Sequence, residues 1–134
     1  MSGAVAGVGA GAKAPAVTVL FGHGSRDPHW RDAMDAVAAR IVERQPGQRV
    51  VCAFLEMSQP DLPTAVAGLV GEGVQRVTVF PLFLGLGRHA REDLPQLMAT
   101  IHSRHPDVEI NWLPSAGEQP LLTDLLATLA LNHI

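Results

Sequence analysis

Three residues that lie far apart in the sequence could act together in chemistry. His23 lies in GHGSRDP, Glu56 ends RVVCAFLE, and His89 lies in GLGRHARED, each directly after a short apolar run. Neutral imidazole and ionised carboxylate are ligands that suit Co, Ni, Fe(II) or Zn. Histidine also suits general-base work near neutral pH. The three side chains are therefore candidates for a site that holds a divalent ion and accepts protons.

Each of these residues also has a purely structural explanation. His23 could hydrogen-bond the turn that HGS and SRDP favour. Glu56 could be the anion at the N-terminus of the following helix, and His89 a solvated residue at a helix start. Two imidazoles and a carboxylate expected at one edge of a sheet favour a functional interpretation. His29 is interpreted as a surface residue, and three further histidines near expected helix ends are interpreted as partners of the helix dipole: His102, His105 and His133.

Alternating strands and helices must position these residues. Runs rich in Val, Ile and Phe predict strands at 16–22, 49–56, 76–83 and 108–114. The first three runs are nearly continuous in apolar character, which is typical of parallel strands covered on both faces. Apolar residues at helical spacing follow each run and predict helices around 30–42, 66–70, 94–101 and 121–129.

This order of elements predicts an α/β fold. Right-handed crossovers give a four-stranded parallel sheet in the order 2-1-3-4 with helices on both faces. Ligands of such sheets bind beyond the carboxyl ends of the strands, at the switch point between strands 1 and 3. His23 and His89 flank that point, so the predicted fold also predicts the place of the site.

The neighbouring residues suggest a partner that carries carboxylates. Ser25, Arg26, Arg88 and Arg91, with the glycine-rich backbones of GHGS and GLG, are expected to bind such groups. The apolar run PLFLGLG lies beside the same edge. It could belong to the core, or it could contact a flat hydrophobic ligand or another subunit, and the sequence leaves these alternatives open.

Composition excludes several classes of partner. The chain has 134 residues, only 10 Lys and Arg, and a formal charge of -3, so nucleic acid is not an expected partner. A single cysteine, Cys52, fits a reducing cytoplasm. We expect residues 1–15 to be a flexible Gly/Ala-rich tail and residues 16–134 to form one domain. No signal peptide and no membrane span of about 18 apolar residues is expected.

Three motifs resemble a known family. GHGSRDP, FLEMSQPDLPTAV and FPLFLGLGRHAREDLPQL are similar, in order and spacing, to the small single-lobe form of the CbiX/SirB class II chelatases, from about residue 16 to 122. The resemblance implies a chelatase-like lobe that works as a homodimer with its cleft between the lobes. It also implies that His23 and His89 handle the metal and that Glu56 is the acidic residue of the site.

The implied activity is insertion of a divalent metal into sirohydrochlorin, a tetrapyrrole. Cobalt is the first choice and nickel or iron the alternatives, and the product could enter cobalamin or siroheme biosynthesis. His23 and His89 would present the ion to the macrocycle while imidazole or Glu56 accepts the pyrrole protons, because only anionic nitrogens are good ligands. No cofactor beyond the metal substrate is expected, since the sequence has no P-loop and no G-x-G-x-x-G after the first strand.

Other functions are compatible with some of these residues. A non-catalytic carrier of metal or tetrapyrrole would use the same pocket. A histidine phosphatase fits less well, because Gly22 stands where its arginine would precede the histidine. A serine hydrolase fits least, because HGSRD is not G-x-S-x-G.

Overall fold

The computed structural model describes residues 15–132. Most of the expected tail and His133 therefore lie outside the described residues. The elements, in chain order, are β1 (Val17–Gly22), α1 (Asp32–Arg44), β2 (Val50–Phe54), α2 (Leu62–Gly71), β3 (Arg76–Pro81), α3 (Arg88–Arg104), β4 (Glu109–Trp112), the short 3-10 helix η2 (Ala116–Glu118) and α4 (Pro120–Asn132). None of the helices in 15–132 has the length and apolar character needed to cross a membrane.

The four strands form one parallel sheet in the order β2-β1-β3-β4, as the sequence predicts. Phe21 of β1 pairs with Ala53 of β2 on one side and with Pro81 of β3 on the other. The carboxyl ends of these strands therefore lie level with one another. The segments that follow β1, β2 and β3 all leave the sheet at this edge.

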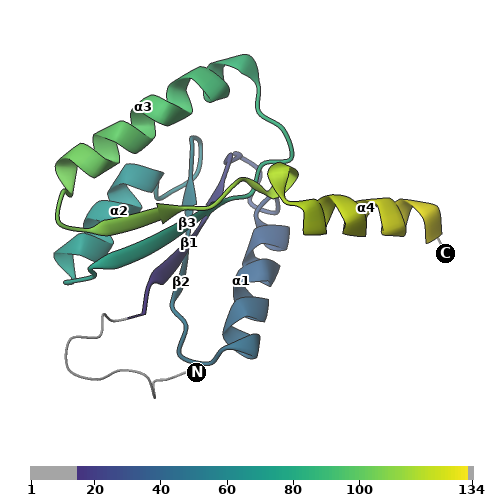
Figure 1. The fold of residues 1–134 in the computed structure, drawn as a ribbon, viewed down its shortest axis with the longest axis horizontal. Helices are drawn as coiled ribbons and strands as arrows, with labels where there is room; N and C mark the ends of the chain where they lie inside the picture. The colour runs from purple at the N-terminus through teal and green to yellow at the C-terminus, as the bar shows by residue number, and fades with distance from the viewer. Residues whose placement is uncertain (1–14, 133–134) are drawn as a thin grey trace.

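Helices cover both faces of the sheet, but unequally (Figure 1). On one face, Val19 and Phe21 belong to a large core that includes residues of α2 and Ile101 of α3. On the other face, Leu20 packs with Met34 of α1 in a smaller core. Alternate side chains of a strand point to opposite faces, so β1 contributes to both cores. α4 lies against neither face and extends away from the lobe (Figure 1).

Burial along β3 corrects one expectation. Its apolar sequence predicts a strand covered on both faces, yet only alternate residues, such as Val77 and Val79, are buried. Thr78 and Phe80 point to the α1 face and are half-buried. The physical reason is that α1 is the one described helix packed on that face, and it lies over β1 and β2.

The first helix begins later than its apolar spacing predicts. Trp30 lies in the turn before α1, which starts at Asp32. Trp30 still packs on the core, because its ring lies 6.2 Å from that of Phe54. The third helix begins earlier than predicted, at Arg88, and continues through Pro95.

Candidate active site

The loops after β1 and β2 bring His23 and Glu56 together. His23 Nε2 lies 3.3 Å from Glu56 Oε1, and the two side chains are 48% and 57% exposed. The backbones are joined as well, since Glu56 N–H donates to His23 C=O at 3.0 Å. Leu55 N–H donates to Gly22 C=O at 2.9 Å, so the sheet pairing continues past the strand ends. The imidazole and carboxylate are therefore held side by side and open to a ligand.

Gly24 allows this close approach. Its φ is +101°, a left-handed conformation that favours glycine. A Cβ at this position would overlap the carbonyl oxygen of Glu56. The glycine is therefore required both by its own conformation and by the neighbouring loop.

Ser58 joins the same two loops through its side chain. Its Oγ accepts from Ser25 N–H at 3.1 Å and donates to Ser25 C=O at 2.9 Å. Sequence reasoning missed Ser58, because nothing in EMSQPD shows that its partner is 33 residues away. It also missed that Gly24 lies against Glu56. The sequence shows that Gly24 is free to adopt a positive φ. It does not show that the Glu56 carbonyl lies too close to position 24 for any side chain.

The structural explanation of Glu56 is wrong. The residue that caps α2 is Asp61, whose side chain accepts from Thr64 N–H at 2.8 Å. The hydrogen bonds from Thr64 lower the pKa of the Asp61 carboxyl below its usual value. Glu56 lies before this cap, in the loop beside His23.

The turn after His23 is stabilised by other residues. Ser25 Oγ accepts from Asp27 N–H at 3.1 Å, and Asp27 Oδ1 accepts from His29 N–H at 2.9 Å. The Ser25 hydroxyl, predicted to bind substrate, therefore has a structural partner. His29 has an 85% exposed side chain that lies 3.5 Å from Asp32, which fits its interpretation as a surface residue.

His89 lies apart from the other two candidates. It is the second residue of α3 and is exposed. The six residues 82–87 separate α3 from β3 and carry the chain beyond the strand ends (Figure 1). Within residues 15–132, no group of three or more His, Cys, Asp or Glu is close enough to hold a metal ion. The structure thus joins His23 with Glu56 but does not bring His89 into contact with them.

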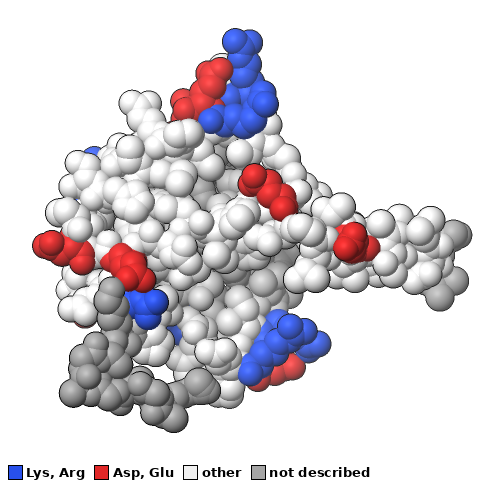
Figure 2. Space-filling model, in the orientation of Figure 1, with Lys and Arg blue, Asp and Glu red and all other residues white. Residues whose placement is uncertain are grey.

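The three arginines predicted to bind carboxylates lie in two places. Arg26 is exposed in the loop after β1, whereas Arg88 and Arg91 lie in the first turns of α3. Arg88 Nε donates to Glu92 Oε1 at 3.3 Å. Figure 2 accordingly shows basic and acidic side chains together at the top of the molecule, over the start of α3. Among the described residues, Arg26 and Arg91 form no ion pair.

The structure shows which residues of the apolar run after β3 belong to the core. Phe83 is 5% exposed and belongs to the core, and Leu82 and Leu86 are half-buried. Leu84 is 70% exposed. Most of the run therefore packs on the core, and Leu84 is its one strongly exposed large apolar side chain.

Comparison with known proteins identifies the family. A family model described as CbiX matches residues 17–131, which include every strand and nearly all of α4. The chain belongs to the CbiX family. It is 36% identical over 87 residues to a protein of Methanocaldococcus jannaschii, covering 65% of this chain and 61% of that one. It is 34% identical over 122 residues to a protein of Methanococcoides burtonii, covering 85% and 93%. Both relatives are named sirohydrochlorin cobaltochelatase, and the chain spans about three fifths of the Methanocaldococcus protein.

Solved structures confirm the predicted chelatase-like lobe. A cobalamin (vitamin B12) biosynthesis CbiX protein from Marinobacter aquaeolei VT8 superposes with a TM-score of 0.74 at 31% identity, covering 89% of this chain and 97% of that one. The sirohydrochlorin chelatase SirB from Bacillus subtilis subspecies spizizenii, solved in complex with cobalt, has a TM-score of 0.67 at 24% identity. The fold of this chain matches 51% of the SirB chain.

Proposed function

We propose that this CbiX-family chain is a chelatase that inserts a divalent metal, cobalt first, into sirohydrochlorin. The observation that carries the proposal is the accessible pair of His23 and Glu56, 3.3 Å apart at the carboxyl edge of the parallel sheet. Relatives named sirohydrochlorin cobaltochelatase support the metal and the macrocycle. Nickel and iron stay as alternatives, because selectivity among such metals depends on geometry and supply more than on ligand type.

The pair supplies the two kinds of chemistry that insertion requires. A divalent metal replaces two pyrrole N–H protons, so the incoming ion needs a ligand and the departing protons need an acceptor. The imidazole of His23 donates a nitrogen lone pair to the ion when neutral. Glu56 accepts protons and returns them to solvent, since more than half of its side chain is exposed.

The three predicted arginines act on the macrocycle. Arg26, Arg88 and Arg91 receive its carboxylates, because guanidinium groups pair with carboxylates through two parallel hydrogen bonds. His89 is the second imidazole that handles the metal, an assignment supported by the CbiX resemblance. Its exposure leaves it available to an ion or to the substrate.

The proposal includes two copies of the chain. One lobe of this fold matches about half of SirB, which supports a homodimer with the cleft between lobes. The product enters the synthesis of a metallated tetrapyrrole, cobalamin or siroheme. A reducing cytoplasm suits Cys52, which is a free thiol.

The deciding experiment mixes purified protein with sirohydrochlorin and Co(II), Ni(II) or Fe(II) in parallel and follows absorbance. We expect cobalt insertion well above the rate without protein. A carrier would bind cobalt and macrocycle without raising the insertion rate, and that result would overturn the proposal. Turnover of an aryl phosphate, without insertion, would point instead to a phosphatase.

Variants then test the site. His23→Ala and His89→Ala should each lower insertion at least about 100-fold while the protein stays folded. Glu56→Gln should slow insertion if the carboxylate accepts protons or binds the ion. His29→Ala is the matched control and should keep full activity, because its side chain faces solvent. Full turnover in both the His23 and the His89 variant would contradict this site.

A further inference from the structure

Met57 has an unusual backbone conformation. Its φ is +63°, and among residues 15–132 it is the one residue other than glycine with a positive φ. Ser58 N–H donates to Glu56 C=O at 2.7 Å, which closes a three-residue turn with Met57 at its centre. Such turns are rare and strained, because at positive φ the Cβ comes too close to the following carbonyl oxygen. The loop therefore carries strain at the residue directly after Glu56.

Contacts on both sides of Met57 maintain this strain. Glu56 N–H donates to His23 C=O at 3.0 Å, and Ser58 Oγ is bonded to the backbone of Ser25. Both neighbours of Met57 are therefore held by the loop after β1. The turn cannot relax without breaking the contacts that place His23 beside Glu56. A strained residue persists only where its surroundings impose its conformation, and such residues are concentrated at functional sites.

The turn does not need a methionine side chain. Glycine adopts a positive φ without strain, and asparagine does so more readily than most residues. The side chain is not part of the lobe interior either, because Met57 is 52% exposed and belongs to neither hydrophobic core. The chain thus keeps a large apolar side chain beside His23 and Glu56 although the backbone there favours glycine. This combination indicates that the side chain contacts a ligand.

We propose that Met57 is a substrate-binding residue whose side chain packs on the ring face of the tetrapyrrole while His23 and Glu56 act at its centre. This inference rests on the proposed function, because the macrocycle is its ligand. Consecutive Cα atoms lie about 3.8 Å apart, so a ring whose nitrogens face Glu56 also covers Met57. Methionine suits this contact, because its unbranched side chain adapts its shape and its polarizable sulfur packs favourably on conjugated rings.

Met57 and the predicted arginines recognise different parts of the macrocycle. The carboxylates lie at its periphery, where Arg26, Arg88 and Arg91 receive them. The ring face between them is apolar, and its contact with Met57 removes apolar surface of both from water. The arginines therefore orient the macrocycle, and Met57 holds its face against the pair that handles metal and protons.

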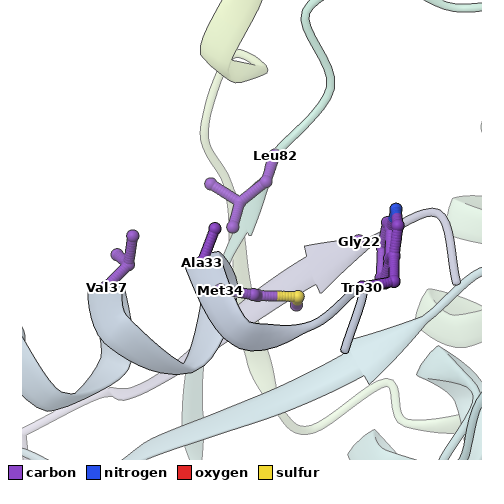
Figure 3. A pocket seen from close by; sticks show the side chains of 6 residues that line it. All are labelled: Gly22, Trp30, Ala33, Met34, Val37 and Leu82. Carbon is purple, nitrogen blue, oxygen red and sulfur yellow. The ribbon is translucent and has the colours of Figure 1, made fainter. Parts of the chain in front are cut away.

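The α1-side groove is another apolar surface near this edge of the sheet. It is lined by six uncharged residues: Gly22, Trp30, Ala33, Met34, Val37 and Leu82. Figure 3 shows Leu82 extending toward α1 from the segment after β3. The groove measures about 270 Å³, below the roughly 300–1,000 Å³ of pockets that enclose a drug-sized ligand. Met34 is 6% exposed and packs with Leu20 and Phe54, so unlike Met57 it has its partners within the lobe.

The first test measures equilibrium binding of metal-free sirohydrochlorin by absorbance titration. Met57→Gln keeps the length of the side chain but makes it polar, and should weaken binding about 10-fold. Met57→Leu keeps the side chain apolar and should bind within about twofold of the wild type. Val42→Gln is the matched control and should not change the affinity, because Val42 is 46% exposed on α1 and belongs to neither core. Equal affinities of the Met57→Gln and Met57→Leu variants would overturn the proposal.

Steady-state insertion kinetics separate contact with the macrocycle from positioning of Glu56. For Met57→Gln we expect a raised KM for sirohydrochlorin and a kcat within about twofold of the wild type. A lowered kcat with an unchanged KM would mean that Met57 only positions Glu56, and would overturn the contact.

Urea unfolding tests the strain. Met57→Gly should raise the urea midpoint, because relief of the strain outweighs the greater freedom of glycine in the unfolded chain. The same variant should bind sirohydrochlorin as weakly as Met57→Gln does. A lowered midpoint would show that the side chain stabilises the lobe, which contradicts the proposal.

Methyl NMR locates the macrocycle on the protein. Methionine labelled with ¹³C in its methyl group gives separate signals for Met34, Met57 and Met98, each assigned by replacement with leucine. The ring current of bound sirohydrochlorin shifts the signals of methyl groups that lie against its face, and we expect the largest shift at Met57. The largest shift at Met34 would place the macrocycle in the α1-side groove, and at Met98 in a pocket that Leu94 and Trp112 also line. Either result would overturn the proposal.

The two proposals fail separately. If sirohydrochlorin shifts the Met57 methyl signal but no metal is inserted, the chelatase is overturned and the contact stands. If Met57→Gln inserts metal with the wild-type KM, the contact is overturned and the chelatase stands. A wild-type protein that does not bind sirohydrochlorin overturns both.

Discussion

The two sides of the candidate site are built very differently. The loops after β1 and β2 are joined by two backbone hydrogen bonds, by Ser58 and by the close approach of Gly24 to Glu56. On the other side, the 82–87 segment is held in its first two residues: Leu82 N–H donates to Phe21 C=O at 2.8 Å, and Phe83 C=O accepts from Gly117 N–H at 2.8 Å. Further along, a Cβ at Gly85 or Gly87 would contact nothing within 4 Å.

This difference separates the two histidines. The contacts that complete the sheet edge also hold the His23 loop, so the folded lobe itself fixes the position of His23. His89 is positioned by α3 and by the end of the 82–87 segment, where Leu84, Gly85 and Gly87 are exposed. The position of His89 therefore depends less on the lobe core than that of His23 does.

The largest expected effect is that of Gly24→Ala. A side chain at positive φ costs about 1–3 kcal/mol, and overlap with the Glu56 carbonyl adds to this, so we expect more than about 2 kcal/mol of lost stability and a displaced Glu56. Urea unfolding and the insertion assay measure the two effects. Gly85→Ala is the matched control on the other side and should change stability by less than about 1 kcal/mol. Equal effects of both substitutions would contradict the comparison.

Ser58→Ala should have the next largest effect. It leaves Ser25 N–H and C=O without their partner, which costs about 1–3 kcal/mol in a half-buried site. Insertion should slow as well, because the loops that hold His23 and Glu56 lose a connection. Ser103→Ala, an exposed position in α3, should leave both unfolding and activity unchanged. An unaltered urea midpoint for Ser58→Ala would mean that the backbone bonds suffice.

Asp61→Ala should cost about 1 kcal/mol, because it removes the N-cap of the helix that follows the Glu56 loop. The folded-state pKa of Asp61 is lowered by Thr64, so its contribution is complete above the unfolded pKa and is lost as pH falls through the folded pKa. Asp61→Asn keeps the cap without titrating. Its thermal stability at neutral pH should match the wild type and then decline less in acid, and parallel acid profiles would contradict this role.

The smallest effect is expected for Arg88→Gln. It breaks an exposed pair with Glu92, whose net contribution is about 0.3–0.5 kcal/mol for residues four apart in a helix. Stability should scarcely change, while the apparent affinity for sirohydrochlorin should fall if Arg88 binds a carboxylate. Glu92→Gln breaks the same pair and should not weaken substrate binding. Titration of both variants with sirohydrochlorin separates the two roles.

Sequence patterning predicted much of the fold. The order βαβαβαβα and the strand order 2-1-3-4 are confirmed, because hydrophobic runs and crossover handedness restrict the topology to few choices. Helix limits were less accurate, since Trp30 fits the helical spacing but packs from a turn. Apolar spacing indicates which side chains face the core, and it does not show where backbone hydrogen bonding begins.

The site was predicted in part for a similar reason. Topology places the ends of β1 and β2 at one edge, so it predicts that His23 and Glu56 are neighbours. It does not give the path of residues 82–87, which carries His89 away, because a glycine-containing segment has many allowed conformations. Topology also does not predict that α4 leaves the lobe. The sequence pattern of an apolar helix is the same whether its own lobe or another one covers it.

The sequence by itself determined the hydrophobic pattern, the order of strands and helices, and the residue types available at the sheet edge, because these follow from local periodicity and chain connectivity. Only the tertiary structure decided the contact between Ser58 and Ser25, the necessity of Gly24 beside Glu56, and the direction of α4. Such contacts join residues remote in the chain, and their energies depend on distances that no local pattern contains.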